Sequence, residues 1–133
     1  MNGVCLSEPQ GPADLQRAFA MFYGVSADKI DYYGSFEAFC DVSSGSGMYL
    51  VETSLKGDFP QWVDLYGFPE CSDIEIAGFL AKALNTEILI SDDTVNDYRW
   101  IVVSKESQRA VFVNADFLDQ FDGFKIDRDT ISN

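Results

Sequence analysis

The sequence of 133 residues contains no histidine. Without an imidazole there is no Ser-His-Asp triad, no Cys-His pair, no histidine zinc motif and no side chain that ordinarily titrates near neutral pH. This absence removes the commonest forms of acid-base and nucleophilic catalysis. We therefore expect that the protein is not an enzyme, and we expect no metal site and no cofactor.

Cysteine is scarce, with only Cys5, Cys40 and Cys71, and none of them forms a CxxC pair. An odd number leaves one thiol over in any disulfide scheme, and none has a basic neighbour in sequence to lower its thiol pKa. Reduced and mostly buried thiols are the expectation. The start lacks the pattern of a signal peptide, and no apolar run approaches the roughly 18 residues of a membrane span. We expect a cytoplasmic protein without a membrane partner.

Basic residues are few, because 9 Lys and Arg stand against 22 Asp and Glu, for a net charge of −13. They are scattered along the chain, whereas neutralising phosphates requires them to cluster, so we expect no direct contact with nucleic acid. A large negative charge instead steers cationic molecules toward the protein. The expected partner is a basic protein.

Apolar residues make up 47% of the chain and include 11 Phe, 6 Tyr and 2 Trp, which is typical of a folded protein. The length matches one domain covering residues 1–133. Helical spacing of Leu and Phe predicts a helix over residues 12–23, between Pro12 and Gly24. The stretch Ser72-Asp73-Ile74-Glu75 matches a capping box and predicts a second helix that begins there.

Alternating patterns predict strands. Residues 36–42 and 48–55 are expected to pair as a hairpin around a Ser/Gly loop, and residues 62–66 fit either a short strand or a turn of helix. Segments 87–90, 98–103 and 109–113 predict a three-stranded meander, followed by a short helical turn or loop that contains Phe117, Leu118 and Phe121. The expected fold is a single α+β domain: a mostly antiparallel sheet, in two hairpins or a meander, packed with two main helices.

Acidic residues are densest between residues 57 and 98, where nine carboxylates accompany a single basic residue, Lys82. The loop 92–97 fails as an EF-hand, because Asp97 stands at the glycine position and Val103 at the glutamate position. Tryptophan and tyrosine near these carboxylates match the composition of a protein interface, although core packing and cross-strand pairing explain them equally well. The candidate partner-binding residues are Trp62, Asp64, Glu70, Asp92, Asp93, Asp97, Tyr98 and Trp100.

Part of the second half, from Leu80 to Asp93 with Tyr98 to Val103 and Val111 to Asp116, resembles a known group of proteins. It is similar to the C-terminal halves of small acidic immunity proteins from bacterial polymorphic toxin and contact-dependent inhibition systems. In those halves a helix and a strand that ends in an acidic loop precede a strand pair. The resemblance implies an inhibitor, not an enzyme, that binds one cognate toxin, often a nuclease with a positive cleft.

Two other functions remain open. A DNA mimic, such as an antirestriction protein, would place rows of carboxylates at the spacing of phosphates. A small enzyme or ligand-binding domain would gather carboxylates in a pocket, as glycoside hydrolases do at a defined separation. Sequence spacing alone does not decide among these classes.

Overall fold

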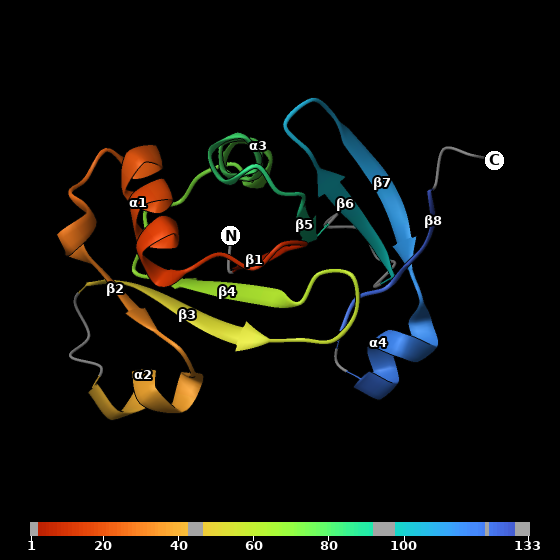
Figure 1. The fold of residues 1–133 in the computed structure, drawn as a ribbon, viewed down its shortest axis with the longest axis horizontal. Coiled ribbons are helices and arrows are strands. Elements are labelled where there is room, and N and C mark those ends of the chain that lie inside the picture. The colour runs from red at the N-terminus through yellow and green to blue at the C-terminus, as the bar shows by residue number, and fades with distance from the viewer. Residues whose placement is uncertain (1–2, 43–46, 92–97, 122, 130–133) are drawn as a thin grey trace.

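The computed structural model describes residues 3–42, 47–91, 98–121 and 123–129, with one sheet and helices on both of its faces (Figure 1). The strands are β1 (Gly3–Leu6), β2 (Ile30–Tyr33), β3 (Met48–Ser54), β4 (Gln61–Tyr66), β5 (Ile88–Ser91), β6 (Arg99–Val103), β7 (Gln108–Val113) and β8 (Ile126–Asp129). The α-helices of the described part are α1 (Pro12–Tyr23), α2 (Phe36–Val42), α3 (Asp73–Leu84) and α4 (Ala115–Phe121), and a 3₁₀ turn, η1, covers Ala27–Lys29.

The eight strands lie in the order β2-β3-β4-β1-β5-β6-β7-β8. Neighbouring strands are antiparallel except for β2 and β3, which are parallel. The expected single α+β domain with a mostly antiparallel sheet is confirmed, and so is the meander, formed by β5, β6 and β7. The uncertain segment 62–66 belongs to strand β4.

Helices α1 and α3 cover one face of the sheet, while α2 and α4 lie on the other side, at opposite ends (Figure 1). The buried apolar side chains of the described residues accordingly form two hydrophobic clusters. Central strand β1 contributes side chains to both clusters. Val4 and Leu6 belong to the cluster under α1 and α3, and Cys5 belongs to the cluster on the other face. A strand buried on both faces reads as an unbroken apolar run, and β1 was missed in the sequence because that run is only three residues long.

The two main helices, α1 and α3, are confirmed, each with 12 residues. Each ends in a left-handed residue whose N–H donates back into the last turn, Gly24 to Ala20 and Asn85 to Ala81. Ser72 is the N-cap of α3, but its side chain makes no capping hydrogen bond, so the hydrogen bond expected from the capping box is wrong. Within the described residues, no helix is both long and apolar enough to span a membrane.

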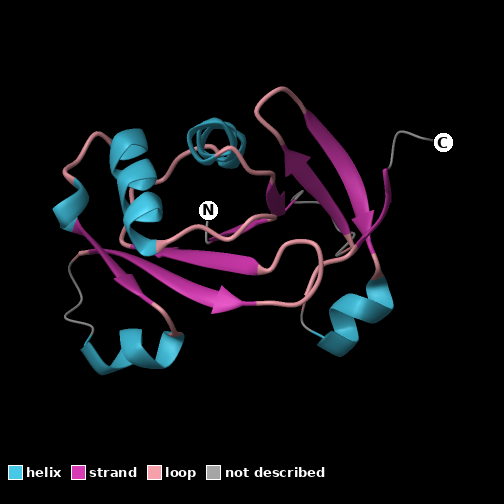
Figure 2. Cartoon of the chain, viewed as in Figure 1, coloured by secondary structure: helices cyan, strands magenta, loops and turns pink. Residues whose placement is uncertain are grey.

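The predicted strand over residues 36–42 is wrong, because this segment forms helix α2 (Figure 2). Ser35 Oγ accepts the N–H of Ala38 at 3.1 Å, which caps the first turn. Phe36 and Phe39 are one helical turn apart, and the Phe39 ring stacks on Tyr66 at 4.7 Å between centroids. Strand β3 instead forms its hairpin with β4.

The cysteines are free thiols, as expected. Only Cys5 is buried, whereas Cys71 is half-buried and Cys40 on α2 is exposed. The expectation of mostly buried thiols is therefore right for Cys5 alone. Burial, with Asp64 nearby, raises the pKa of the Cys5 thiol far above its usual range, which keeps this sulfur neutral.

The turn between β3 and β4 docks against the chain just before β8. The Asp58 N–H donates to the Phe124 carbonyl at 2.6 Å, and the Phe124 N–H donates to the Lys56 carbonyl at 3.2 Å. Gly57 has φ of +97°, and a Cβ there would overlap the carbonyl oxygen of Phe124. A Cβ on Gly123 would likewise overlap the carbonyl oxygen of Lys56. Two glycines therefore permit this backbone contact, which we call the 57–124 bridge.

Replacing Gly57 by alanine should destabilise the fold by roughly 2 kcal/mol, because the positive φ and the overlap with Phe124 both disfavour a side chain. The matched control is Gly78→Ala in α3, where a Cβ meets no atom within 4 Å. This second change should stabilise by about 0.5–1 kcal/mol, since alanine is the better helix former. Urea unfolding of both variants checks the pair, and equal stabilities would contradict the tight contact at Gly57.

Candidate functional site

Strand β4 places two of the candidate residues on the sheet face away from α1 and α3. Burial alternates along the strand, with Val63 and Leu65 buried in the cluster beneath those helices. Trp62 and Asp64 consequently share the opposite face, two residues apart. The Trp62 indole N–H donates to Asp64 Oδ1 at 2.6 Å, which fixes the two side chains relative to each other.

Gly3 on the adjacent strand leaves the room that this pair occupies. It stands directly opposite Asp64 in the β1-β4 register. A Cβ at Gly3 would lie 3.0 Å from Asp64 Oδ1 and 3.0 Å from indole atoms of Trp62, which is closer than side chains normally approach. Gly3 was not among the predicted site residues, and its only signal in the sequence is its place before the apolar run of β1.

Phe124 joins the two tryptophans. Its ring stacks on Trp62 at 6.2 Å between centroids with an interplanar angle of 17°, and it meets Trp100 at 4.7 Å with an angle of 61°. Phe124 is buried, and the 57–124 bridge holds its backbone in place. Trp62 and Trp100, which are 38 residues apart in the chain, therefore contact the same ring, although Phe124 was not among the predicted site residues.

A pocket of about 240 Å³ opens beside this aromatic cluster. We call it the Trp62 pocket; it is lined by Thr53, Leu55, Trp62, Asp64, Leu118 and Phe124. The lining combines one carboxylate and one hydroxyl with apolar and aromatic walls, which is the usual make-up of a ligand site. Its residues come from strands β3 and β4, the turn between them, helix α4 and the segment before β8.

Asp64 is the unusual group in this pocket. Partial burial raises the pKa of its carboxyl group, and the hydrogen bond from Trp62 only partly opposes that effect. Described ion pairs such as Arg17 with Asp14 at 3.2 Å and Arg109 with Glu87 at 3.3 Å involve other carboxylates. Among the residues that the structure describes, no ion pair joins a cation to Asp64. The charge of Asp64 also raises the pKa of Tyr66, for which burial is the larger cause.

The remaining candidate residues do not line the Trp62 pocket. Tyr98 packs against the hydrophobic cluster that contains Phe124, and its hydroxyl donates to Asp119 of α4 at 3.4 Å. Glu70 is exposed in the segment between β4 and α3, beyond the end of β4 that is farther from Trp62. Asp92, Asp93 and Asp97, which the sequence predicts to lie in a loop, fall outside the described residues.

The acidic block of residues 57–98 is dispersed over several elements. The Asp58 carboxylate accepts the N–H of Ile126 at 2.8 Å, and Glu87 pairs with Arg109 from β7. Asp73 and Glu75 occupy the first turn of α3, where carboxylates are favourable near the positive end of the helix dipole. Several acids that are neighbours in sequence thus have structural partners of their own.

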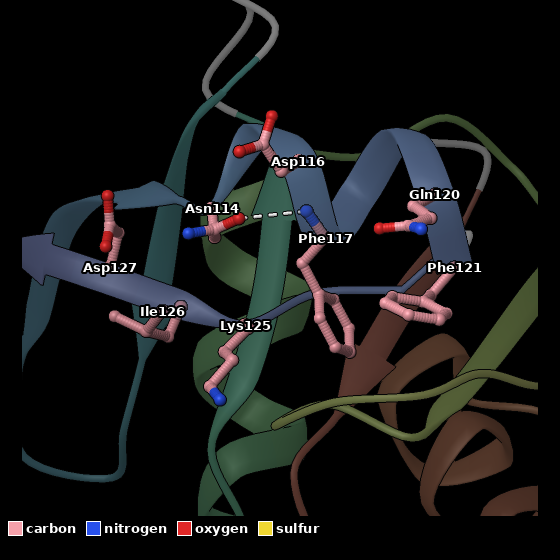
Figure 3. Close-up of a pocket in the computed structure, with 8 residues that line it drawn as sticks. All are labelled: Asn114, Asp116, Phe117, Gln120, Phe121, Lys125, Ile126 and Asp127. Carbon is pink, nitrogen blue, oxygen red and sulfur yellow. Dashed lines mark hydrogen bonds between the residues drawn. The ribbon is translucent and has the colours of Figure 1, made fainter.

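A second pocket, of about 300 Å³, lies along α4 (Figure 3). The Asn114 side chain caps the helix, since its Oδ1 accepts the Phe117 N–H at 2.9 Å. Asp116 and the two phenyl rings, Phe117 and Phe121, extend from opposite sides of α4 (Figure 3). Lys125 lines the same pocket as Asp116 and Asp127. Throughout the described ranges, no three Cys, Asp or Glu residues gather closely enough to hold a metal ion.

Comparison with protein-family models, with curated proteins and with solved structures finds no significant match to this chain.

Replacing Asp64 by asparagine should stabilise the protein at neutral pH. The pKa of Asp64 is higher in the folded chain than in the unfolded chain. The folded state therefore loses stability as pH rises from the unfolded-state pKa through the folded-state pKa. Asparagine keeps an oxygen for the Trp62 N–H and carries no charge. The gain should stay below about 1 kcal/mol, since solvent screens a half-exposed carboxylate.

Urea unfolding at a series of pH values checks this prediction. The two proteins should differ least in acid, where Asp64 is protonated in both states, and most near neutral pH. Asp31→Asn, an equal charge change at an exposed position of β2, is the control and should change stability by less than about 0.5 kcal/mol. A destabilised Asp64→Asn variant at neutral pH would show that the carboxylate supports the fold.

Proposed function

We propose that this protein is a non-enzymatic inhibitor that binds a cationic protein, as the immunity proteins that part of its second half resembles bind their cognate toxins. One observation carries the proposal. Asp64 is a partly buried carboxylate without a described cationic partner, in a pocket walled by aromatic residues. An ionisable side chain that lowers the stability of its own fold is a candidate for binding a partner.

The aromatic cluster beside Asp64 supports a protein partner. Energetically important interface residues are enriched in tryptophan and tyrosine and lie in well-packed pockets. Trp62 and Trp100 are both half-buried, so each packs against Phe124 and still presents surface to solvent. Because both indole rings already pack on Phe124 in the free chain, less side-chain freedom is lost on association.

The net charge of −13 supports a basic partner. Opposite charges accelerate the first encounter, whereas a few desolvated contacts slow dissociation and set specificity. A nuclease toxin fits this requirement, because its cleft is positive in order to hold phosphates. The surplus of exposed carboxylates would supply the steering, and the Trp62 pocket would supply the short-range contact.

The alternative functions gain less support from the same observations. Glycoside hydrolysis uses two carboxylates across a cleft, whereas the Trp62 pocket is lined by one, Asp64. The pocket along α4 is lined by two, Asp116 and Asp127, together with Lys125, and it is where a carboxylate pair would have to act. A DNA mimic relies on rows of exposed carboxylates, whereas Asp64 lies among aromatic and aliphatic side chains.

Expression together with a toxin encoded beside this protein tests the proposal. The native chain should restore growth of the producing cells and should purify with the toxin as a stable complex. Lysine at Asp92, Asp93 and Asp97 should slow association at least about tenfold at low salt, because charge steering is lost. Stopped-flow measurements over a range of salt concentrations give the rate.

The matched control carries lysine at Asp28, Asp31 and Glu37, three exposed residues of η1, β2 and α2 with the same total charge change. Equal slowing in the two triple variants would reject the acidic loop as the site of steering. Toxicity that persists with the native chain, together with failure to form a complex, would reject the inhibitor function.

A further inference from the structure

We propose that the Trp62 pocket receives the side chain of an arginine from the cationic protein partner, with Asp64 as the counter-ion and the Trp62 indole as the stacking surface. This inference rests on the proposed function, because it names the group by which that partner would be recognised.

The chemistry of the pocket matches the two halves of an arginine side chain. Leu55, Leu118 and Phe124 provide apolar contact for the methylene stem. Asp64 and Thr53 provide oxygen acceptors for the guanidinium N–H groups. A volume of about 240 Å³ has room for this one side chain, and the indole face offers a cation–π contact.

Asp64 is already oriented for such a partner. Its Oδ1 accepts the indole N–H of Trp62, so the carboxylate is held against one wall of the pocket. Gly3 stands directly opposite Asp64 and has no side chain, so the pair lies close against the β1 backbone, where a Cβ would come within 3.0 Å of Asp64 Oδ1. Cys5, opposite Trp62 on the same strand, is a neutral thiol. A preoriented carboxylate loses little freedom when it pairs with a cation.

Arginine fits this site better than other cations. Its guanidinium is planar, weakly hydrated and always charged, and it stacks on aromatic rings while it hydrogen-bonds a carboxylate. The ammonium of lysine is strongly hydrated and therefore loses more hydration free energy on entering a partly apolar pocket. A metal ion would need several ligands, and the lining holds a single carboxylate.

Titration of the native protein with N-acetyl-arginine amide tests the proposal without the partner. The indole N–H signal of Trp62, assigned by its loss in Trp62→Phe, should shift and saturate. N-acetyl-citrulline amide has nearly the same shape without the charge, and it should bind at least about tenfold more weakly. N-acetyl-lysine amide should also bind more weakly than the arginine compound. Equal responses to the arginine and citrulline compounds, or to the arginine and lysine compounds, would overturn the assignment.

Two variants locate the binding. Asp64→Asn should weaken arginine binding at least about tenfold, whereas the control Asp31→Asn should leave it unchanged. Thr53→Lys places a cation at an exposed position of the pocket rim and should also suppress binding, by pairing with Asp64. Because Thr53 is exposed, this variant tests the site even if Asp64→Asn changes the fold. Undiminished binding in Thr53→Lys and Asp64→Asn would overturn the proposal.

Failure of this inference differs from failure of the proposed function. If the native chain neutralises a toxin while Asp64→Asn binds that toxin with unchanged affinity, the arginine pocket is rejected and the inhibitor function stands. If the arginine compound binds as expected but no toxin is bound, the inhibitor function is rejected and the pocket stands.

Discussion

The 57–124 bridge is the contact on which the rest of the candidate site depends. It joins the turn after β3 to the chain before β8, two segments that lie near opposite ends of the sheet order. Paired backbone hydrogen bonds hold the contact, and Gly57 and Gly123 allow the two backbones to approach. The bridge positions Phe124 between Trp62 and Trp100 and thereby forms one wall of the pocket.

The pocket in turn keeps the Asp64 carboxylate partly out of water. Burial disfavours its charged form more than the Trp62 hydrogen bond favours it, so the fold carries a small electrostatic strain in its unbound state. A bound cation would relieve that strain. The carboxylates of the chain would then have two separate roles. Exposed carboxylates attract a cationic partner at long range, and the oriented carboxylate of Asp64 pairs with it at contact.

Local patterns predicted the parts of the fold that local interactions determine. Periodicity predicts helix α1 and the meander β5-β6-β7, and the pattern from Ser72 to Glu75 predicts where α3 begins, although the Ser72 side chain makes no capping hydrogen bond. The same reasoning was wrong for segment 36–42. Phe36, Ala38, Cys40 and Val42 alternate as in a strand, whereas Phe36 and Phe39 also fit one helical turn, and the packing of Phe39 on Tyr66 favours the helix. Composition made Trp62, Asp64 and Trp100 candidate site residues. Gly3 and Phe124 lie beside them only because of strand pairing and the 57–124 bridge. Such long-range contacts leave no periodic trace in a single sequence.

The central claim is that the bridge creates a partly desolvated carboxylate at Asp64. The most direct test is the pKa of the Asp64 carboxyl group, followed by the pH dependence of its ¹³C chemical shift in the native protein and in Gly57→Ala. The account predicts a pKa above the ordinary aspartate value in the native protein and a return toward that value when the bridge is broken. A native pKa at or below the ordinary value, or one that Gly57→Ala leaves unchanged, would contradict it.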